Sequence, residues 1–189
     1  MSAADCTVAR LPGRRFGGPH VREMDKLTIA IANTSTESME LDRLLWEVLW
    51  KPLGLPQDFR GSVKLGGECL ELVVKADLRI VGGLAANWID DSEVGIRHIA
   101  LRPEVQNQGM GRRLVMYLIS TVSGLGCVRV RTIARSASVG FFRKLGFAIS
   151  PGKPPEHPDF ESHGITFVLM EKDVAQTGQG DEVNQVRPT

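Results

Sequence analysis

A chain of 189 residues with 42% hydrophobic and 24% charged residues is large enough to bury one core without disulfides or a structural metal. Its formal net charge of +1 gives no basis for a nucleic-acid or membrane-surface partner, and no apolar run is long enough to cross a bilayer. Cys6, Cys69 and Cys127 are odd in number and far apart, without metal-ligand spacing. We therefore expect reduced thiols, no metal site and a cytoplasmic protein.

Composition divides the chain into three parts. Residues 1–25 are rich in Gly, Pro and Arg, show no period and lack the hydrophobic stretch of a secretory signal, so we predict a flexible leader. Residues 175–189 are polar and aperiodic, which predicts a disordered tail. The periodic segments between them predict one folded domain over residues 26–174.

The first predicted elements are a strand over Leu27–Asn33 and a helix that begins with a capping box at Thr34 and Glu37. Apolar residues then recur at helical spacing: Leu41, Leu44, Leu45, Val48 and Leu49. Lys51-Pro52 is predicted to end this helix, and 52–61 to be a loop or a broken helix.

Two tryptophans of this helix, Trp46 and Trp50, lie four residues apart and off the leucine face. They are consistent with the wall of a ligand site, with extra core or with a homodimer contact.

Three extended segments follow, at 70–75, 79–88 and 93–101, and short turns at Ala76-Asp77 and Asp90-Asp91 make them an antiparallel meander. The remaining predicted elements are a helix from Gly111, a strand over Val128–Ile133, a short helix over Ser138–Leu145 and a last strand over Ile165–Met170. This order predicts an α/β (α+β) fold with a mixed, mostly antiparallel central sheet and helices on both faces.

A glycine-containing loop lies between the third strand of the meander and the next helix: Gln106, Asn107, Gln108, Gly109, Met110 and Gly111. Such a loop at a helix N-terminus directs several N–H groups into one concavity, where the helix dipole also favours an anion. Arg112 and Arg113 follow directly and add positive charge. The loop has neither the Walker nor the Rossmann pattern, and an unliganded turn is the alternative reading of the motif alone.

The surrounding sequence resembles the GNAT superfamily of acyl-CoA N-acyltransferases. Ile96-Arg97-His98-Ile99-Ala100-Leu101-Arg102-Pro103, followed by Gln106-x-x-Gly109-x-Gly111, is similar to the family's motif A. The segment from Ala134 to Phe147, which ends in Leu145-Gly146-Phe147, is similar to its second motif. Segments at 47–54, 160–165 and 170–172 resemble those of a bacterial small-molecule subgroup, and the resemblance covers residues 27–173.

The resemblance implies that acetyl-CoA is the cosubstrate. It places the pantetheine arm against the backbone of Ile99, Ala100 and Leu101, the pyrophosphate on the loop 106–111 with Arg112, and Arg135, Ser138 and Phe142 beside the acyl group. The sequence departs from the family at three positions. Gln106-Asn107 replaces the usual Arg-Gly, Arg135 replaces a frequent Asn, and Phe142 replaces the Tyr that often acts as a general acid.

Amide formation needs a base for the amine and a proton for the leaving thiolate. Glu93, His98, Glu161 and His163 are candidate bases. Glu93 and His98 face opposite sides of a regular strand, so only a bulge would bring both to one cleft. Glu93 is favoured because a Glu on this strand often acts through water in the family, and the alternative is a solvated turn residue. Ser138 and water are the expected proton donors, and Arg97 is a candidate for recognising an anionic acceptor.

The function that these features predict is an N-acetyltransferase that moves an acetyl group from acetyl-CoA to a small-molecule amine by direct attack. The alternatives are acetylation of a protein N-terminus or lysine, and a non-catalytic acyl-CoA sensor, which the missing Tyr keeps open.

Overall fold

The computed structural model describes residues 27–57, 68–155 and 158–174. The predicted leader over 1–25, the predicted tail over 175–189 and the end of the predicted 52–61 loop lie outside the described residues. Seven strands form one sheet in the order β1-β2-β3-β4-β5-β7-β6. Their bounds are β1 Leu27–Ile31, β2 Cys69–Ala76, β3 Arg79–Trp88, β4 Glu93–Leu101, β5 Arg129–Arg135, β6 Ala148–Ile149 and β7 Phe167–Asp173.

The sheet is mixed and mostly antiparallel, as predicted. Every adjacent pair is antiparallel except β4 and β5, which run in parallel because α3, Met110–Ser123, crosses between them. The predicted bounds of β3 and β4 are confirmed at both ends. β5 and β7 begin and end later than predicted, and β6 and the short helix α5, Pro158–Glu161, are additional elements.

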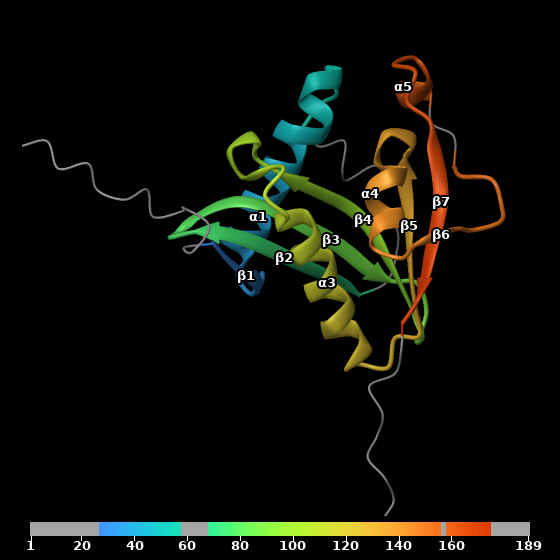
Figure 1. Cartoon of the computed structure of the whole chain (residues 1–189). Coiled ribbons are helices and arrows are strands. Elements are labelled where there is room, and N and C mark those ends of the chain that lie inside the picture. The colour runs from blue at the N-terminus through green and yellow to red at the C-terminus, as the bar shows by residue number, and fades with distance from the viewer. Residues whose placement is uncertain (1–26, 58–67, 156–157, 175–189) are drawn as a thin grey trace, which may run out of the picture.

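Helices cover both faces of the sheet, which confirms the predicted layers (Figure 1). α3 and α4, Val139–Lys144, lie on one face, where their apolar side chains share a core with alternate residues of the strands. α1, Ser35–Leu45, covers the other face of β2, β3 and β4 with its buried leucines Leu41, Leu44 and Leu45. The buried residues of α3 are apolar and lie on one face of the helix: Met110, Leu114, Val115, Leu118, Ile119 and Val122.

The first helix begins as predicted but ends differently. Thr34 Oγ1 accepts a hydrogen bond from the N–H of Glu37 at 3.2 Å, and Glu37 in turn accepts one from the N–H of Asn33 at 3.0 Å. The helix then widens into a π-helical turn, η2, over Trp46–Trp50, and a 3₁₀ turn, η3, follows over Lys51–Leu53. The sequence shows no sign of this wider turn, which buries Trp50 while leaving Trp46 half-buried.

α1 packs closely on the sheet because β3 carries glycine at the contact. A Cβ atom added to Gly83 would lie 2.4 Å from the Leu41 side chain and 2.5 Å from the carbonyl oxygen of Leu72. Both neighbours are fixed, since Leu41 is fully buried and Leu72 lies in the adjacent strand.

We expect Gly83→Ala to destabilise the fold by about 1–3 kcal/mol, the usual cost of overpacking a core. The matched control is Gly140→Ala in α4, where the added methyl group meets nothing within 4 Å and a helical alanine should be neutral or stabilising. Urea unfolding of both variants measures the difference, and equal stability of the two would contradict the close packing of α1.

Candidate functional site

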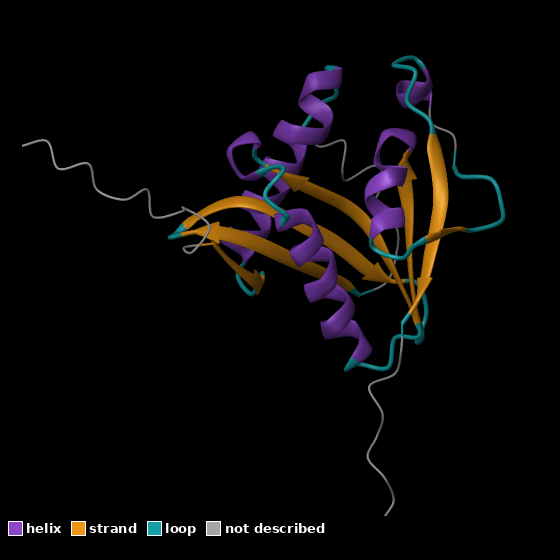
Figure 2. Cartoon of the chain, viewed as in Figure 1, coloured by secondary structure: helices purple, strands orange, loops and turns teal. Residues whose placement is uncertain are grey.

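The central feature of the site is the short pairing of β4 with β5. The two strands pair only from Glu93 to Ile96 on β4 and from Arg129 to Thr132 on β5. Beyond these residues both strands continue, and they diverge into a V that opens toward their carboxyl ends (Figure 2). A parallel sheet commonly binds ligands where the carboxyl ends of neighbouring strands separate in this way.

The far end of β4 directs backbone groups into the V. The N–H of Arg102 donates to the carbonyl of Val81 on β3 at 2.8 Å, so in the ladder of this pair Ala100 is also bonded to β3. Ile99 and Leu101 alternate with it and direct their N–H and C=O groups toward β5. This geometry suits the expected contacts of Ile99 and Leu101 with a pantetheine arm. It gives no support to Ala100, whose backbone is bonded to β3 and whose methyl group packs toward α1.

A β-bulge at Arg97 changes which side chains face the V. Ala86 pairs with Ile96 and Ala85 pairs with His98, so Arg97 is the extra residue of β4. Ile96 therefore faces the core under α3, whereas His98 lies with Ala85 on the face that α1 covers. This is the bulge that would bring Glu93 and His98 to the same face of the strand.

A cavity of 340 Å³ occupies the V. Its walls are largely apolar, and four aromatic side chains contribute to them: Trp50 of η2, Phe142 of α4, Phe160 of α5 and Phe167 of β7. The polar side chains in its lining are Arg97, His98, Thr132, Arg135 and Ser138. Because the lining comes from both faces of the sheet, a ligand on the α3 side and a ligand on the α1 side would meet inside the V.

The loop before α3 is an uncapped helix N-terminus. Asn107 and Gly109 both have left-handed backbone conformations, with φ of 58° and 78°, and they turn the chain sharply into the helix. Gly109 is the N-cap residue and supplies no side chain to bond the first N–H groups of α3. The side chains of Gln106 and Gln108 fold back instead, donating to the carbonyls of Leu101 at 2.7 Å and Glu104 at 2.8 Å.

With no side-chain cap on the first N–H groups of α3, the loop has the geometry that the predicted anion cradle requires. Arg112 and Arg113 are exposed on the first turn of the helix. Arg102, by contrast, is bonded to Glu47 of η2 at 3.0 Å.

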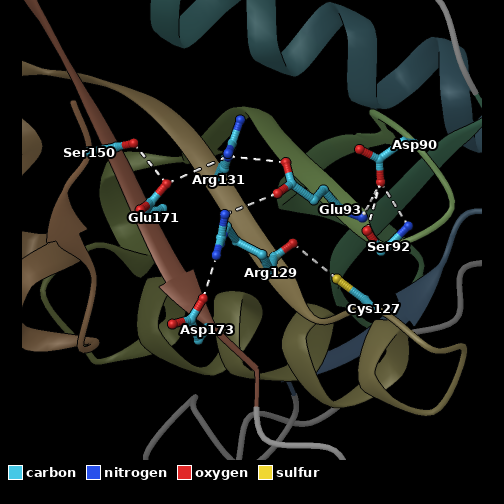
Figure 3. A network of polar contacts seen from close by, with 9 residues as sticks. All are labelled: Asp90, Ser92, Glu93, Cys127, Arg129, Arg131, Ser150, Glu171 and Asp173. Atoms are coloured by element: carbon cyan, nitrogen blue, oxygen red, sulfur yellow. Dashed lines mark hydrogen bonds and ion pairs between the residues drawn. The ribbon is translucent and has the colours of Figure 1, made fainter. Parts of the chain in front are cut away.

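Glu93, the base favoured by the sequence, lies in an ionic network where β4 and β5 converge (Figure 3). Its two carboxylate oxygens contact Arg129 at 3.3 Å and Arg131 at 3.1 Å. Arg129 is also paired with Asp173, and Arg131 with Glu171. Glu93 does not line the cavity, and it is roughly 20 Å along the strand from Ile99. The geometry therefore gives no support to a general-base role for Glu93.

The other candidate bases fall into two groups. His98 lies in the cavity, where its ring makes an edge contact with Trp50 at a centroid distance of 4.8 Å. Glu161 and His163 are exposed at the end of α5 and do not line the cavity.

The expected acyl-end residues, Ser138, Phe142 and Arg135, all line the cavity. Ser138 lies at the start of α4, and Phe142 is buried between Phe141 and Phe147. Arg135 reaches across the V to the α1 side, where it donates to the carbonyl of Leu49 at 3.0 Å.

Three parts of this site were absent from the sequence prediction. The bulge at Arg97 has no recognisable sequence pattern. The walls supplied by Pro155, Phe160 and Phe167 come from segments whose folding back onto β5 depends on tertiary structure. The π-helical turn that brings Leu49 and Trp50 to the cavity interrupts an otherwise regular helical pattern.

No helix among the described residues is long and apolar enough to span a membrane. Within the same residues, His, Cys, Asp and Glu side chains form no cluster of three or more that could hold a metal ion.

Comparison with known proteins gives a family match. A model described as the acetyltransferase (GNAT) family matches residues 35–147, which include α1, the V and the loop before α3.

Solved structures share the fold at low identity. The ribosomal-protein-S18-alanine N-acetyltransferase from Escherichia coli has a TM-score of 0.64 and 18% identity, over 82% of this chain and 99% of that chain. An aminoglycoside 6'-N-acetyltransferase complexed with coenzyme A has a TM-score of 0.63 and 15% identity, over 82% of this chain and 99% of that chain. A GNAT family acetyltransferase from Elizabethkingia anophelis with acetyl-CoA bound has a TM-score of 0.58 and 17% identity, over 79% of this chain and 99% of that chain.

We expect Glu93→Gln to weaken the fold and leave the chemistry of the cavity nearly unchanged. The variant loses two ion pairs, each worth about 1 kcal/mol or less at partly exposed positions. Urea unfolding should show this loss, and the turnover of an accepted substrate should fall by less than about tenfold. A folded Glu93→Gln protein that loses about a hundredfold or more in kcat would restore Glu93 as the base.

Proposed function

Because the chain belongs to the acetyltransferase (GNAT) family, we propose that it acetylates the amine of a small molecule bound in the cavity between β4 and β5. It is an acyl-CoA-dependent enzyme with acetyl-CoA as its cosubstrate. The observation that carries the proposed acceptor class is the enclosure of the cavity by aromatic side chains on several sides. Acetyl-CoA supplies an activated thioester carbonyl, and the residues of this chain have to hold it, orient the amine and move protons.

The residues on the α3 side fit the phosphates and the pantetheine arm. The uncapped N-terminus of α3 offers N–H groups to the pyrophosphate, and Arg112 adds a charge-assisted contact. Along the open edge of β4 the backbone of Ile99 and the N–H of Leu101 are available, whereas the carbonyl of Leu101 already accepts a hydrogen bond from Gln106. A chain that follows these two features is led from the surface loop into the V.

Proton movement falls to groups inside the cavity. Attack by the amine forms a C–N bond and breaks the C–S bond, so one proton leaves nitrogen and one is gained by sulfur. His98 lies on the α1 side of β4 and carries an imidazole, the commonest general base in enzymes, so we assign it the amine proton.

Ser138 lies on the opposite side, at the start of α4, and we assign its hydroxyl the proton that the leaving sulfur gains. Phe142 has no proton to give. Tyr117 lies on an exposed face of α3 and does not line the cavity.

The shape of the acceptor side favours a small molecule over a protein substrate. η2 closes one side with Leu49 and Trp50, and the arm formed by α5 and β7 closes another with Phe160 and Phe167. An extended peptide needs an open groove with unpaired backbone edges, whereas this cavity is bounded by bulky rings. The proposal is tested against two alternative functions. One is acetylation of a protein N-terminus or lysine, and the other is acyl-CoA sensing without catalysis.

We expect Gly111→Val to abolish CoA binding. A Cβ atom on Gly111 meets Phe141 at 3.4 Å, an ordinary contact, so the helix should remain folded while the branched side chain fills space beside the phosphate cradle. Thermal shift with CoA measures the effect, because a ligand that binds only the folded state raises its stability.

Met116→Val, on an exposed position of the same helix, is the control and should keep the full shift. A folded Gly111→Val protein that binds CoA normally would show that the cradle is not the phosphate site.

We expect His98→Gln to lower kcat/KM by about a hundredfold or more while the thermal shift with CoA is retained. The acid limb of the pH–rate profile should disappear in the variant, because a glutamine side chain does not titrate. His163→Gln is the control, since that histidine is exposed outside the cavity. Steady-state release of free CoA with a panel of amines provides the rates. An unchanged acid limb in His98→Gln would assign the base to another group.

A further inference from the structure

Two kinds of arginine lie on the α1-facing side of the V. Arg129 and Arg131, where the strands converge, each contact two carboxylates. Arg97 and Arg135 line the cavity and form no ion pair with any carboxylate of the described residues. The positive charge of the cavity wall is therefore uncompensated within the described structure, although carboxylates are plentiful on the same face of the sheet.

Arg97 is held in place by neutral groups alone. As the bulged residue of β4 it turns back along the sheet, and its Nε donates to the side-chain oxygen of Asn87 at 2.5 Å. Asn87 is itself buried, and a Cβ atom on Gly95 would lie 3.2 Å from the guanidinium, so the glycine leaves room for it. Arg97 lines both the cavity of the V and a second cavity of 380 Å³ beside it.

Arg135 lies opposite, at the carboxyl end of β5. One of its terminal nitrogens donates to the carbonyl of Leu49, which leaves the other donors of the planar group available at the cavity. Burial lowers the pKa of both Arg97 and Arg135, because removing a guanidinium from water disfavours its charged form. An arginine nevertheless keeps its charge, so each group carries an unbalanced desolvation cost in the free enzyme.

This charge decides which amines the cavity can accept. A simple alkylammonium ion is a cation, and at about 8 Å from a guanidinium it is repelled by roughly 2 kcal/mol at an effective dielectric constant of 20. An acceptor that also carries an oxyanion reverses the sign of the interaction. A guanidinium matches the geometry of a carboxylate or phosphate with paired N–H donors. The phosphates of CoA do not fill this role, because the cradle for them lies at the N-terminus of α3, outside the cavity lining.

We propose that the acceptor is a small amine that also carries an oxyanion, a carboxylate or a phosphate monoester, and that Arg97 with Arg135 binds this group while the aromatic walls bind the apolar part. The proposal rests on the proposed acetyltransferase function and names its substrate class. Arg97 and Arg135 are specificity residues, since they bind the acceptor and take no part in the proton transfers.

The test compares matched acceptors that differ only in the oxyanion. Phenylethylamine and phenylalanine form one pair, without and with a carboxylate. Ethanolamine, O-phosphoethanolamine and β-alanine form a second set, which carries no oxyanion, a phosphate monoester and a carboxylate, respectively. CoA release is measured for wild type, Arg97→Gln and Arg135→Gln. Arg131→Gln is the control, because it removes an arginine from the same face that already has two carboxylate partners.

We expect wild type to prefer an oxyanion-bearing member of a set by about tenfold or more in kcat/KM. Arg97→Gln should raise KM for that acceptor by a similar factor with kcat nearly unchanged, and should leave the neutral amine unaffected or improved. Arg131→Gln should keep the preference, and the thermal shift with CoA should be the same in wild type, Arg97→Gln and Arg131→Gln. Equal use of charged and neutral members by wild type, or an equal loss for both in Arg97→Gln, would overturn the proposal.

Failure of the proposed function gives a different result. A wild-type protein that releases no CoA with any amine is not an amine acetyltransferase. Titration calorimetry of phenylalanine, β-alanine and O-phosphoethanolamine into the CoA-saturated protein then measures binding at the anion site independently of turnover. If at least one of these compounds binds to wild type and not to Arg97→Gln, the anion site is supported. If none of them binds to wild type, the proposed anion site is overturned.

Discussion

The functional surface of this protein depends on one constraint: β4 and β5 share only a short stretch of parallel pairing. A strand that loses its neighbour exposes backbone groups that must find other partners. Here the exposed edge belongs to Ile99 and Leu101, and the space beside it is the cavity. α3 and α4 pack on one face and α1 on the other, so each face of the sheet has its own core.

The distribution of charge follows the same division. Where the strands are paired, carboxylates and guanidiniums neutralise one another in the network of Figure 3. That network joins β4, β5 and β7 on the face opposite α3, beyond the strands that α1 covers, and it stabilises the strands where they come together. Where the strands diverge, the arginines have only neutral partners in the described structure. Along β5, guanidinium groups with carboxylate partners, Arg129 and Arg131, are thus separated from Arg135, which has none among the described residues.

The sequence predicted the regular parts of the fold well, since these depend on local patterns. Alternating residues and short polar turns fix β3 and β4 at both ends, and the capping box at Thr34 fixes the start of α1. The sharp turn before α3 was predictable for the same reason, because Asn107 and Gly109 are residues that tolerate the left-handed conformations it requires. β6 and α5 were missed because they are short and acquire their position only by contact with β7 or the cavity.

The catalytic assignment illustrates the limit of pattern reasoning. On a regular strand, Glu93 and Leu101 share a face, and that alternation favoured Glu93 as the base. A single extra residue at Arg97 reverses the alternation halfway along β4, and Glu93 forms ion pairs with Arg129 and Arg131 at the end of the strand away from the cavity. Distance along the strand and the partners of a carboxylate are both tertiary facts, so no reading of spacing alone could have supplied them.

The bond from Arg135 to Leu49 has a mechanical consequence. Leu49 lies near the end of a helix, where carbonyl groups lack helical donors, and Pro52 has no N–H to offer one. The guanidinium that takes this carbonyl is anchored on the opposite half of the sheet, so it acts as a strut that sets how far the two halves stand apart. Widening the cavity for a bulkier acceptor would break the hydrogen bond between Arg135 and Leu49. Substrate size and the rigidity of the sheet are therefore coupled through this one hydrogen bond.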